Sequence, residues 1–165
     1  MKELSIDNVR GEAGTIALGA ACARAWQAAD AGQGMFVHLR GELGAGKTTL
    51  VRAWLRGLGH QGAVRSPTYT LIEPYELPSG PAYHLDLYRL GDPEELEFLG
   101  LRDLLEVPAL VLVEWPERGA GVLPRADLTI AMEHAGEARK LLFTAQTGVA
   151  ETCLARLRDS VNAGD

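Results

Sequence analysis

The spacing of hydrophobic residues over the first 60 positions predicts a strand, a helix, a second strand and a second helix, in that order. Residues 3–6 alternate and predict a first strand. From 15 to about 29 the apolar positions follow helical spacing, and glycines at 32 and 34 end that helix. The short apolar run at 35–39 predicts a strand that leads directly into further glycines, and residues 47–58 predict a second helix with one apolar face.

The middle of the chain predicts a hairpin. Two extended runs, 68–75 and 81–90, are separated by a cluster of proline and glycine. In the second run Tyr83, Leu85 and Leu87 are predicted to share one face, with His84, Asp86 and Tyr88 on the other. We therefore expect polar and apolar side chains to be separated across this strand.

The C-terminal half continues the alternation of helices and buried strands. Residues 91–106 predict one or two short helices, and 109–114 form an uninterrupted apolar strand of the kind covered on both faces. Residues 127–132 and 138–145 predict a second hairpin, and a closing helix is expected at about 150–162. The predicted class is α/β, with a central, mostly parallel sheet, antiparallel hairpins and flanking helices.

Composition agrees with one globular domain over residues 1–165. The chain is 47% hydrophobic and 23% charged, and its length suffices for a core without metals or disulfides. Cys22 and Cys153 lie far apart and outside any Cys/His cluster, which predicts buried free thiols. No apolar stretch approaches the roughly 18 residues of a membrane span, and the first 14 residues lack a signal-peptide pattern. We expect a cytoplasmic protein without membrane contact.

The charge distribution bears on possible partners. Lys and Arg number 16, Asp and Glu number 22, and the net charge is −6. The acidic excess lies in the second half, where residues 91–165 carry 14 acidic and 7 basic groups. Because phosphate neutralisation drives nucleic-acid affinity, an acidic chain without a basic stripe is a poor independent binder of nucleic acid.

Residues 41–49, GELGAGKTT, fit the phosphate-loop pattern GxxxxGK[ST] between a predicted strand and a predicted helix. Glycines let backbone N–H groups converge on a polyphosphate, and the start of a helix adds a favourable dipole. Lys47 would supply a point charge to the outer phosphates, and the Thr48 hydroxyl could coordinate Mg²⁺. The alternative is a glycine-rich turn without a ligand.

Two acidic residues are candidates for the metal side of such a site. Glu114 ends the apolar strand and precedes Trp115 and Pro116, where P-loop proteins usually place an Asp. Its alternative is a solvated carboxylate at a strand end. Asp86 lies inside an apolar extended run, and its alternative is a solvent-facing carboxylate of the hairpin.

The absent motifs narrow the class of P-loop protein. NKxD and DxxG do not occur, which argues against a Ras-like GTPase. A small-molecule kinase would need an acceptor pocket and an Arg-bearing lid, whereas the region after the second helix holds a hairpin and an acidic helix. A kinase is thereby disfavoured but stays the alternative enzyme. A nucleotide-gated adaptor with incidental hydrolysis is the third possibility.

Several segments taken together resemble the TsaE (YjeE) family of bacterial P-loop ATPases. They are GELGAGKTTL, VRSPTYTLIEPY, HLDLYRL and LVEWPE, in this order. Thr15, Leu18 and Gly19 near the start and the GEAR segment ending at Arg139 also match the family pattern. The resemblance covers about residues 3–145, and the helix after residue 149 extends beyond that core.

The resemblance implies an ATPase needed for the threonylcarbamoyl modification (t6A) of the adenosine next to the anticodon in ANN-decoding tRNAs. It implies ATP and Mg²⁺ as ligands and the proteins TsaD and TsaB as partners. Such a protein does not transfer the threonylcarbamoyl group itself, and tRNA would be held mainly by the partner complex.

The resemblance also assigns roles to residues. Catalytic roles fall to Asp86, near the γ-phosphate and the attacking water, to Lys47, and to Thr68 of the SPTY segment, which resembles a switch loop. Thr48 and Glu114 would bind Mg²⁺. The full nucleotide-binding set comprises Thr15, Leu43, Gly44, Ala45, Gly46, Lys47, Thr48, Thr49, Asp86, Glu114, Trp115 and Arg139.

Some aromatic residues have competing interpretations. Trp115 would lie beside the nucleotide, and packing in the core is its alternative. Trp26 and Trp54 are predicted to be core residues. His84 is predicted to be a hairpin-face residue and not a ligand or base.

Overall fold

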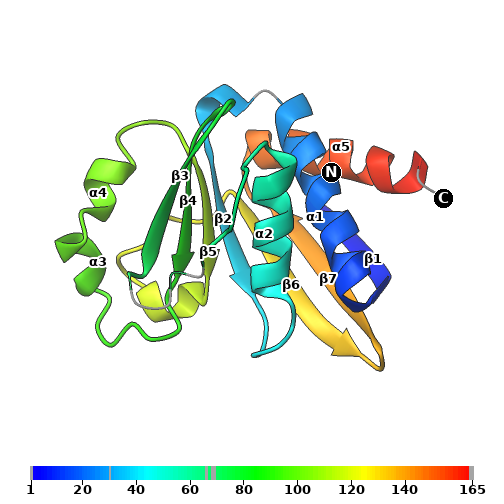
Figure 1. The fold of residues 1–165 in the computed structure, drawn as a ribbon, viewed down its shortest axis with the longest axis horizontal. Helices are drawn as coiled ribbons and strands as arrows, with labels where there is room; N and C mark the ends of the chain where they lie inside the picture. Colours follow the sequence, from blue (N-terminus) through cyan, green and yellow to red (C-terminus); the bar gives the residue numbers. More distant parts are fainter. Residues whose placement is uncertain (1, 30, 66, 68–69, 164–165) are drawn as a thin grey trace.

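The computed structural model describes residues 2–29, 31–65, 67 and 70–163 of the chain. It contains a seven-stranded mixed sheet in the order β1-β7-β6-β2-β5-β4-β3 (Figure 1). The strands are β1 (Glu3–Arg10), β2 (Met35–Arg40), β3 (Ile72–Leu77), β4 (Gly80–Asp86), β5 (Leu110–Glu114), β6 (Leu128–Ala135) and β7 (Ala138–Ala145). The helices are α1 (Gly11–Ala28), α2 (Lys47–Gly57), α3 (Glu95–Phe98), α4 (Leu101–Leu104) and α5 (Gly148–Ala163), with short 3-10 turns η1 (Ala31–Gln33) and η2 (Pro116–Gly119).

The four central strands β6, β2, β5 and β4 are parallel, and β3, β7 and β1 add antiparallel edges. The carboxyl ends of the parallel strands therefore meet at one edge of the sheet, at the bottom of Figure 1. Both predicted hairpins, β3–β4 and β6–β7, are present. The expected α/β class and mostly parallel central sheet are confirmed.

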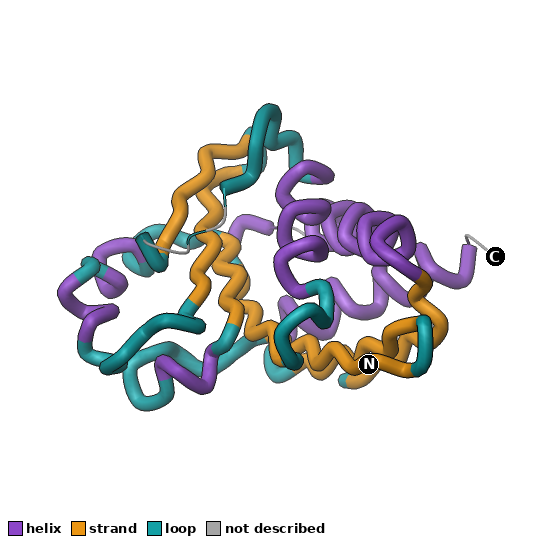
Figure 2. Tube along the Cα trace, turned by 60° about the horizontal axis from the view of Figure 1, so that its bottom comes forward, coloured by secondary structure: helices purple, strands orange, loops and turns teal. Residues whose placement is uncertain are grey.

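Alternation along the buried strands creates two separate cores. In β5, Leu110 and Leu112 join the core under α1, α2 and α5, whereas Val111 and Val113 join the core under α3 and α4. Full burial of a side chain such as Leu112 contributes about 1.5–3 kcal/mol, so each face of this strand anchors its own layer. Figure 2 shows the long helices gathered on one side of the strands, with the short helices at the opposite end of the molecule.

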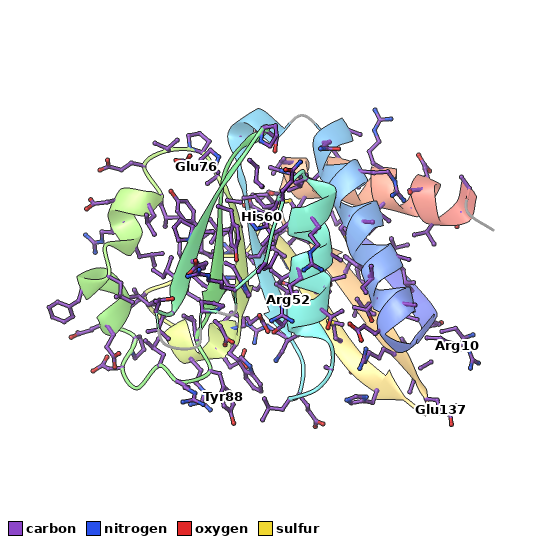
Figure 3. The ribbon with its side chains drawn as sticks, viewed as in Figure 1. Arg10, Arg52, His60, Glu76, Tyr88 and Glu137 are labelled. Atoms are coloured by element: carbon purple, nitrogen blue, oxygen red, sulfur yellow. The ribbon has the colours of Figure 1, made fainter. Side chains whose placement is uncertain are left out.

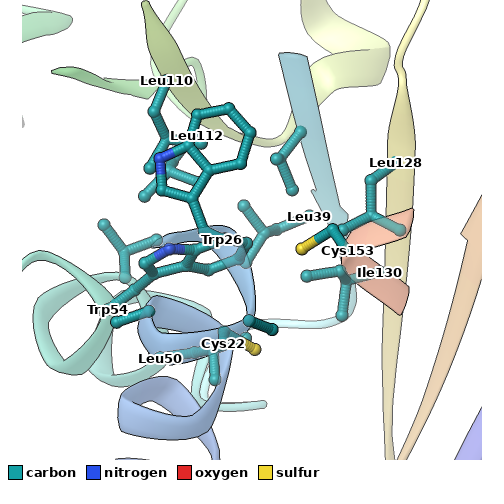
Figure 4. Packing of buried hydrophobic residues seen from close by; sticks show 14 of the residues in the cluster. Cys22, Trp26, Leu39, Leu50, Trp54, Leu110, Leu112, Leu128, Ile130 and Cys153 are labelled. Carbon is teal, nitrogen blue, oxygen red and sulfur yellow. The ribbon is translucent and has the colours of Figure 1, made fainter. Parts of the chain in front are cut away.

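Close packing of α1 on α2 holds the N-terminal helix against the sheet. A Cβ atom on Gly19 would lie 2.4 Å from the Cβ of Ala53, so only glycine permits this approach. Trp26 and Trp54, 2% and 0% exposed, lie in the core that these helices form with the sheet, among residues such as Leu110 and Leu112 (Figure 4). The predicted core positions of both tryptophans are confirmed.

The two cysteines are buried and free, as predicted. Burial raises the pKa of Cys153 to about 12 and raises that of Cys22 as well. Both thiols are therefore protonated, inert parts of the core.

The structure differs from the sequence predictions at several element ends, for example in β1, which runs to Arg10, and in β3, which is Ile72–Leu77. The first helix begins at Gly11, four residues before the predicted start. The strand expected over 81–90 ends at Asp86, whose carboxylate accepts a hydrogen bond of 3.1 Å from the N–H of Tyr88. The prediction that Tyr88 shares a strand face with His84 and Asp86 is wrong, because this local bond turns the chain out of the sheet.

No helix within the described ranges combines the length and apolar character that crossing a membrane requires.

Candidate functional site

The loop over residues 41–46 connects β2 to α2 at the carboxyl edge of the sheet. Gly44 and Gly46 have φ angles of 79° and 103°, in the left-handed region that favours glycine. A Cβ atom on Gly46 would also lie 2.9 Å from the guanidinium of Arg139. The loop therefore depends on glycine at this position, and it presents the N-terminal N–H groups and the positive dipole end of α2.

Lys47 is the first residue of α2 and is only 4% exposed. Its Nζ donates to the carbonyl oxygen of Gly41 and lies 3.5 Å from the centre of the Trp115 ring. Burial lowers the pKa of the Lys47 ammonium, and the negative charge of Glu114 acts in the opposite direction. A buried cation is thus held at the centre of the glycine loop.

Thr48 faces the acidic residue that ends the neighbouring strand β5. Its Oγ1 lies 2.8 Å from Oε1 and 3.0 Å from Oε2 of Glu114. Glu114 is 2% exposed, because alternation along β5 directs it to the face covered by α2. The solvated strand-end alternative for Glu114 is therefore wrong.

Asp86 lies beside Glu114 on the next parallel strand. The two residues are register partners in the β4–β5 ladder, and Asp86 is half-buried. Burial, and after it the negative charge of Glu114, raise the pKa of Asp86. The alternative of a hairpin carboxylate facing solvent is wrong, because β4 pairs with β5 as well as with β3.

His84 lies beside the two acidic residues, on a face of the β3–β4 hairpin as predicted, but that face is covered and not open to solvent. Its side chain is 0% exposed, and its Nε2 lies 2.6 Å from Oε2 of Glu114. The available signal was its position two residues before Asp86 on the same strand face.

Arg139 on β7 connects the loop to the first helix. Its guanidinium donates to Oγ1 of Thr15 at 3.3 Å and to the carbonyl oxygen of Gly44 at 3.2 Å. Thr15 is fully buried and donates in turn to the carbonyl of Gly11 at 3.3 Å. Residues 124 positions apart are thus brought together at the rim of the loop.

Trp115 has a left-handed backbone conformation, with φ of 57° and ψ of 50°. Such a conformation is costly for a bulky residue and persists where the surroundings enforce it. The Trp115 ring contacts Lys47 and lies 5.0 Å from the ring of Tyr88, which is labelled at the lower edge of Figure 3. Trp115 therefore lies in the wall of the site, and its ring also packs against the core under α3 and α4, so the two interpretations are compatible.

A pocket of about 430 Å³ lies in front of the loop. Its walls contain Leu43, Gly44, Ala45, Gly46, Lys47, Thr48, Thr49, Asp86, Tyr88, Arg89, Glu114 and Trp115. A neighbouring cleft of about 820 Å³ shares Leu43, Tyr88 and Trp115 and continues to the end of β6. The structure thus brings together ten of the predicted site residues in one pocket, with Thr15 and Arg139 at its rim, whereas Thr68 lies outside the described residues.

The groups present suit Mg²⁺ with a polyphosphate. Thr48 and Glu114 offer oxygen ligands, which Mg²⁺ prefers, and the loop offers N–H donors and a cation for phosphates. Within the described part of the chain, no three His, Cys, Asp or Glu side chains gather into a metal site of their own. Mg²⁺ is commonly held by one or two protein groups together with substrate phosphates and water.

The parallel strand, glycine loop and helix, with an acidic residue on the adjacent strand, define a P-loop NTPase fold. The sequence model of the family described as "Threonylcarbamoyl adenosine biosynthesis protein TsaE" matches residues 9–141, and the chain belongs to this family. The resemblance inferred from the sequence is confirmed.

Named relatives agree with this assignment. The chain is 49% identical over 120 residues to the tRNA threonylcarbamoyladenosine biosynthesis protein TsaE of Haemophilus influenzae. The matched region covers 73% of this chain and 76% of the relative. It is 41% identical over 119 residues to the protein of the same name from Bacillus subtilis, covering 72% and 74%. The crystal structure of Bacillus subtilis YdiB superposes with a TM-score of 0.71 at 32% identity, over 96% of each chain. The family is thus one of tRNA threonylcarbamoyladenosine biosynthesis.

Proposed function

We propose that this protein is a Mg²⁺-dependent ATPase required for t6A modification of the adenosine next to the anticodon in ANN-decoding tRNAs. It acts with a complex of TsaD and TsaB and does not transfer the threonylcarbamoyl group itself. The observation that carries the proposal is the contact between Thr48, at the start of α2, and the buried Glu114 beside the Lys47 ammonium.

The loop binds the phosphates of ATP. Backbone N–H groups of residues 43–48 and the N-terminal dipole of α2 favour negative charge there. On binding, the Lys47 ammonium exchanges its hydrogen bond to the Gly41 carbonyl for one to a phosphate oxygen. The exchange is favourable because the new acceptor is negatively charged, whereas the carbonyl is neutral. Thr48 and Glu114 hold Mg²⁺, which neutralises charge on the phosphates when bound.

Asp86 positions the attacking water and accepts its proton. The carboxylate lies beside Glu114 at the pocket wall, and its raised pKa makes it a stronger base than an ordinary Asp. Thr68 is the second group proposed to act on the γ-phosphate side. Trp115 lies beside the nucleotide, and Thr15 with Arg139 flanks its base or ribose.

The net charge of −6 supports a division of labour with the partners. Because an acidic surface does not attract the tRNA backbone, the partner complex supplies most of the tRNA contact. ATP hydrolysis by this protein then supports turnover of that complex.

Reconstituted modification of an ANN-decoding tRNA with TsaD and TsaB tests the proposal, with wild type compared with Asp86→Ala. Loss of the water-positioning group should lower hydrolysis by about 10²-fold while Mg-ADP binding persists, and modification should fall with hydrolysis. Asp103→Ala, which removes an exposed carboxylate on α4, is the matched control.

Two outcomes would replace the proposal. Full modification by an Asp86→Ala protein that no longer hydrolyses ATP would indicate an adaptor. Phosphate transfer to a small-molecule acceptor, without ATP consumption in its absence, would indicate a kinase.

A further inference from the structure

His84 occupies a fixed place behind the two acidic residues. In the β4–β5 register His84 pairs with Leu112, and Asp86 pairs with Glu114. His84 therefore lies one side-chain step deeper in the sheet than Asp86, on the same strand face. At 0% exposure it cannot reach a nucleotide in the pocket, so any influence on the site passes through its neighbours.

The contact of His84 with Glu114 is short and directional. Nε2 lies 2.6 Å from Oε2 of Glu114, at the short end of the distances found for hydrogen bonds between ring nitrogens and carboxylates. Because an ionised carboxylate only accepts, Nε2 carries the proton, and the buried Nδ1 has no hydrogen-bond partner among the described residues. The bond to Glu114 is thus the one hydrogen bond that the described residues give the His84 ring.

The two oxygens of Glu114 are consequently held differently. Thr48 has one hydroxyl proton to share between Oε1 at 2.8 Å and Oε2 at 3.0 Å. Oε2 has His84 as a second donor, whereas no other donor to Oε1 occurs within the described structure. The carboxylate is anchored through Oε2 by His84. Oε1 lies next to the Thr48 hydroxyl, where both oxygens can bind one cation.

We infer that His84 is the positioning residue for the metal-binding carboxylate, an inference that rests on the proposed Mg²⁺ site. Its hydrogen bond fixes the rotamer of Glu114, so that Oε1 and the Thr48 hydroxyl present one preformed oxygen pair to Mg²⁺. Removing such a supporting hydrogen bond typically costs about 10–100-fold in metal affinity.

The test compares ADP affinity with Mg²⁺ and with EDTA by calorimetric titration, and the ratio of the two dissociation constants is the magnesium gain. His84→Asn, whose amide is too short to replace Nε2, should lower this gain by about tenfold or more without changing ADP affinity in EDTA. His84→Gln places an amide nitrogen near Nε2 and should keep the gain within about threefold of wild type. A role in packing alone would not produce rescue by Gln.

His38→Asn is the matched control. His38 is also a buried histidine on a parallel strand, but it faces the other core, against Phe36, and its Nε2 has no partner among the described residues. Its substitution should leave the magnesium gain unchanged. Melting curves establish that each variant is folded, and His84→Leu replaces His84→Asn if that protein does not fold.

The positioning role would be overturned, with the metal site left standing, if the magnesium gain were undiminished in His84→Asn or His84→Leu. It would also be overturned if His84→Gln lowered the magnesium gain as much as His84→Asn does. A wild-type protein whose ADP affinity does not respond to Mg²⁺ would overturn the metal site itself, and this inference with it.

Discussion

Replacing Thr48 with valine removes one hydroxyl from the centre of the site and keeps the shape of the side chain. In the folded protein that hydroxyl donates to Glu114, a carboxylate that is 2% exposed. Hydrogen bonds to buried charged groups contribute about 1.5–3 kcal/mol, and their loss leaves the acceptor partly unsatisfied. We therefore expect Thr48→Val to destabilise the metal-free protein by that amount.

This energy converts into a measurable shift in melting temperature. An unfolding entropy of about 2.1 cal/mol/K per residue, over 165 residues, predicts a fall of about 4–9 °C. Calorimetric melting in EDTA measures it. The same variant should bind ADP without the magnesium gain, because one of the two proposed oxygen ligands is missing.

Thr152→Val is the control for this substitution. It also deletes a threonine hydroxyl bonded to an oxygen, the Gly148 carbonyl at 3.1 Å, but on the exposed side of α5. Its melting temperature should stay close to that of wild type, and its magnesium gain should be unchanged. A Thr48→Val protein that melts with wild type and retains the gain would refute the structural reasoning about Thr48 and Glu114.

Three further predictions concern Trp115, Asp86 and the packing of α1 on α2. Because the Lys47 ammonium lies 3.5 Å from the Trp115 ring, Mg-ADP should change Trp115 fluorescence in a chain whose two core tryptophans are phenylalanine; unchanged emission at saturation would contradict its placement. Burial raises the pKa of Asp86 above 3.8, so the folded protein holds this proton more tightly than the unfolded chain. Asp86→Asn should therefore raise the melting temperature near neutral pH, and this gain should shrink as the pH falls toward 3.8; a gain independent of pH would be inconsistent with the raised pKa. Gly19→Ala should destabilise the protein by about 1–3 kcal/mol, because its Cβ would lie 2.4 Å from that of Ala53; a variant melting at or above wild type would show that α1 and α2 separate freely.

Features carried by contiguous sequence could be predicted from the residues alone. The loop over 41–46 follows an apolar strand and precedes an amphipathic helix, so the motif and its context lie in one segment. Glu114 could be predicted in the same way, since an uninterrupted apolar strand must be buried and its last residue marks the carboxyl edge.

Features that depend on strand order could not be predicted in this way. A hairpin pattern over 72–86 does not reveal that β4 also pairs with β5, and this second pairing buries His84 and brings Asp86 to Glu114. The contact of Arg139 with Thr15 likewise depends on β7 lying near α1, which the local sequence pattern does not encode. Asp86 was a candidate from its place in an apolar run, and the family resemblance supplied its role and the residue Arg139, but neither indicated the contact of His84 with Glu114.

Steady-state ATP hydrolysis by the purified protein, alone and with TsaD and TsaB, tests the central claim most directly. Wild type should hydrolyse ATP only with Mg²⁺ and faster with the partner complex, whereas Lys47→Ala should lose most nucleotide binding and all stimulation while remaining folded. Hydrolysis that is independent of Mg²⁺, or that is equal in wild type and Lys47→Ala with the partners present, would contradict the account.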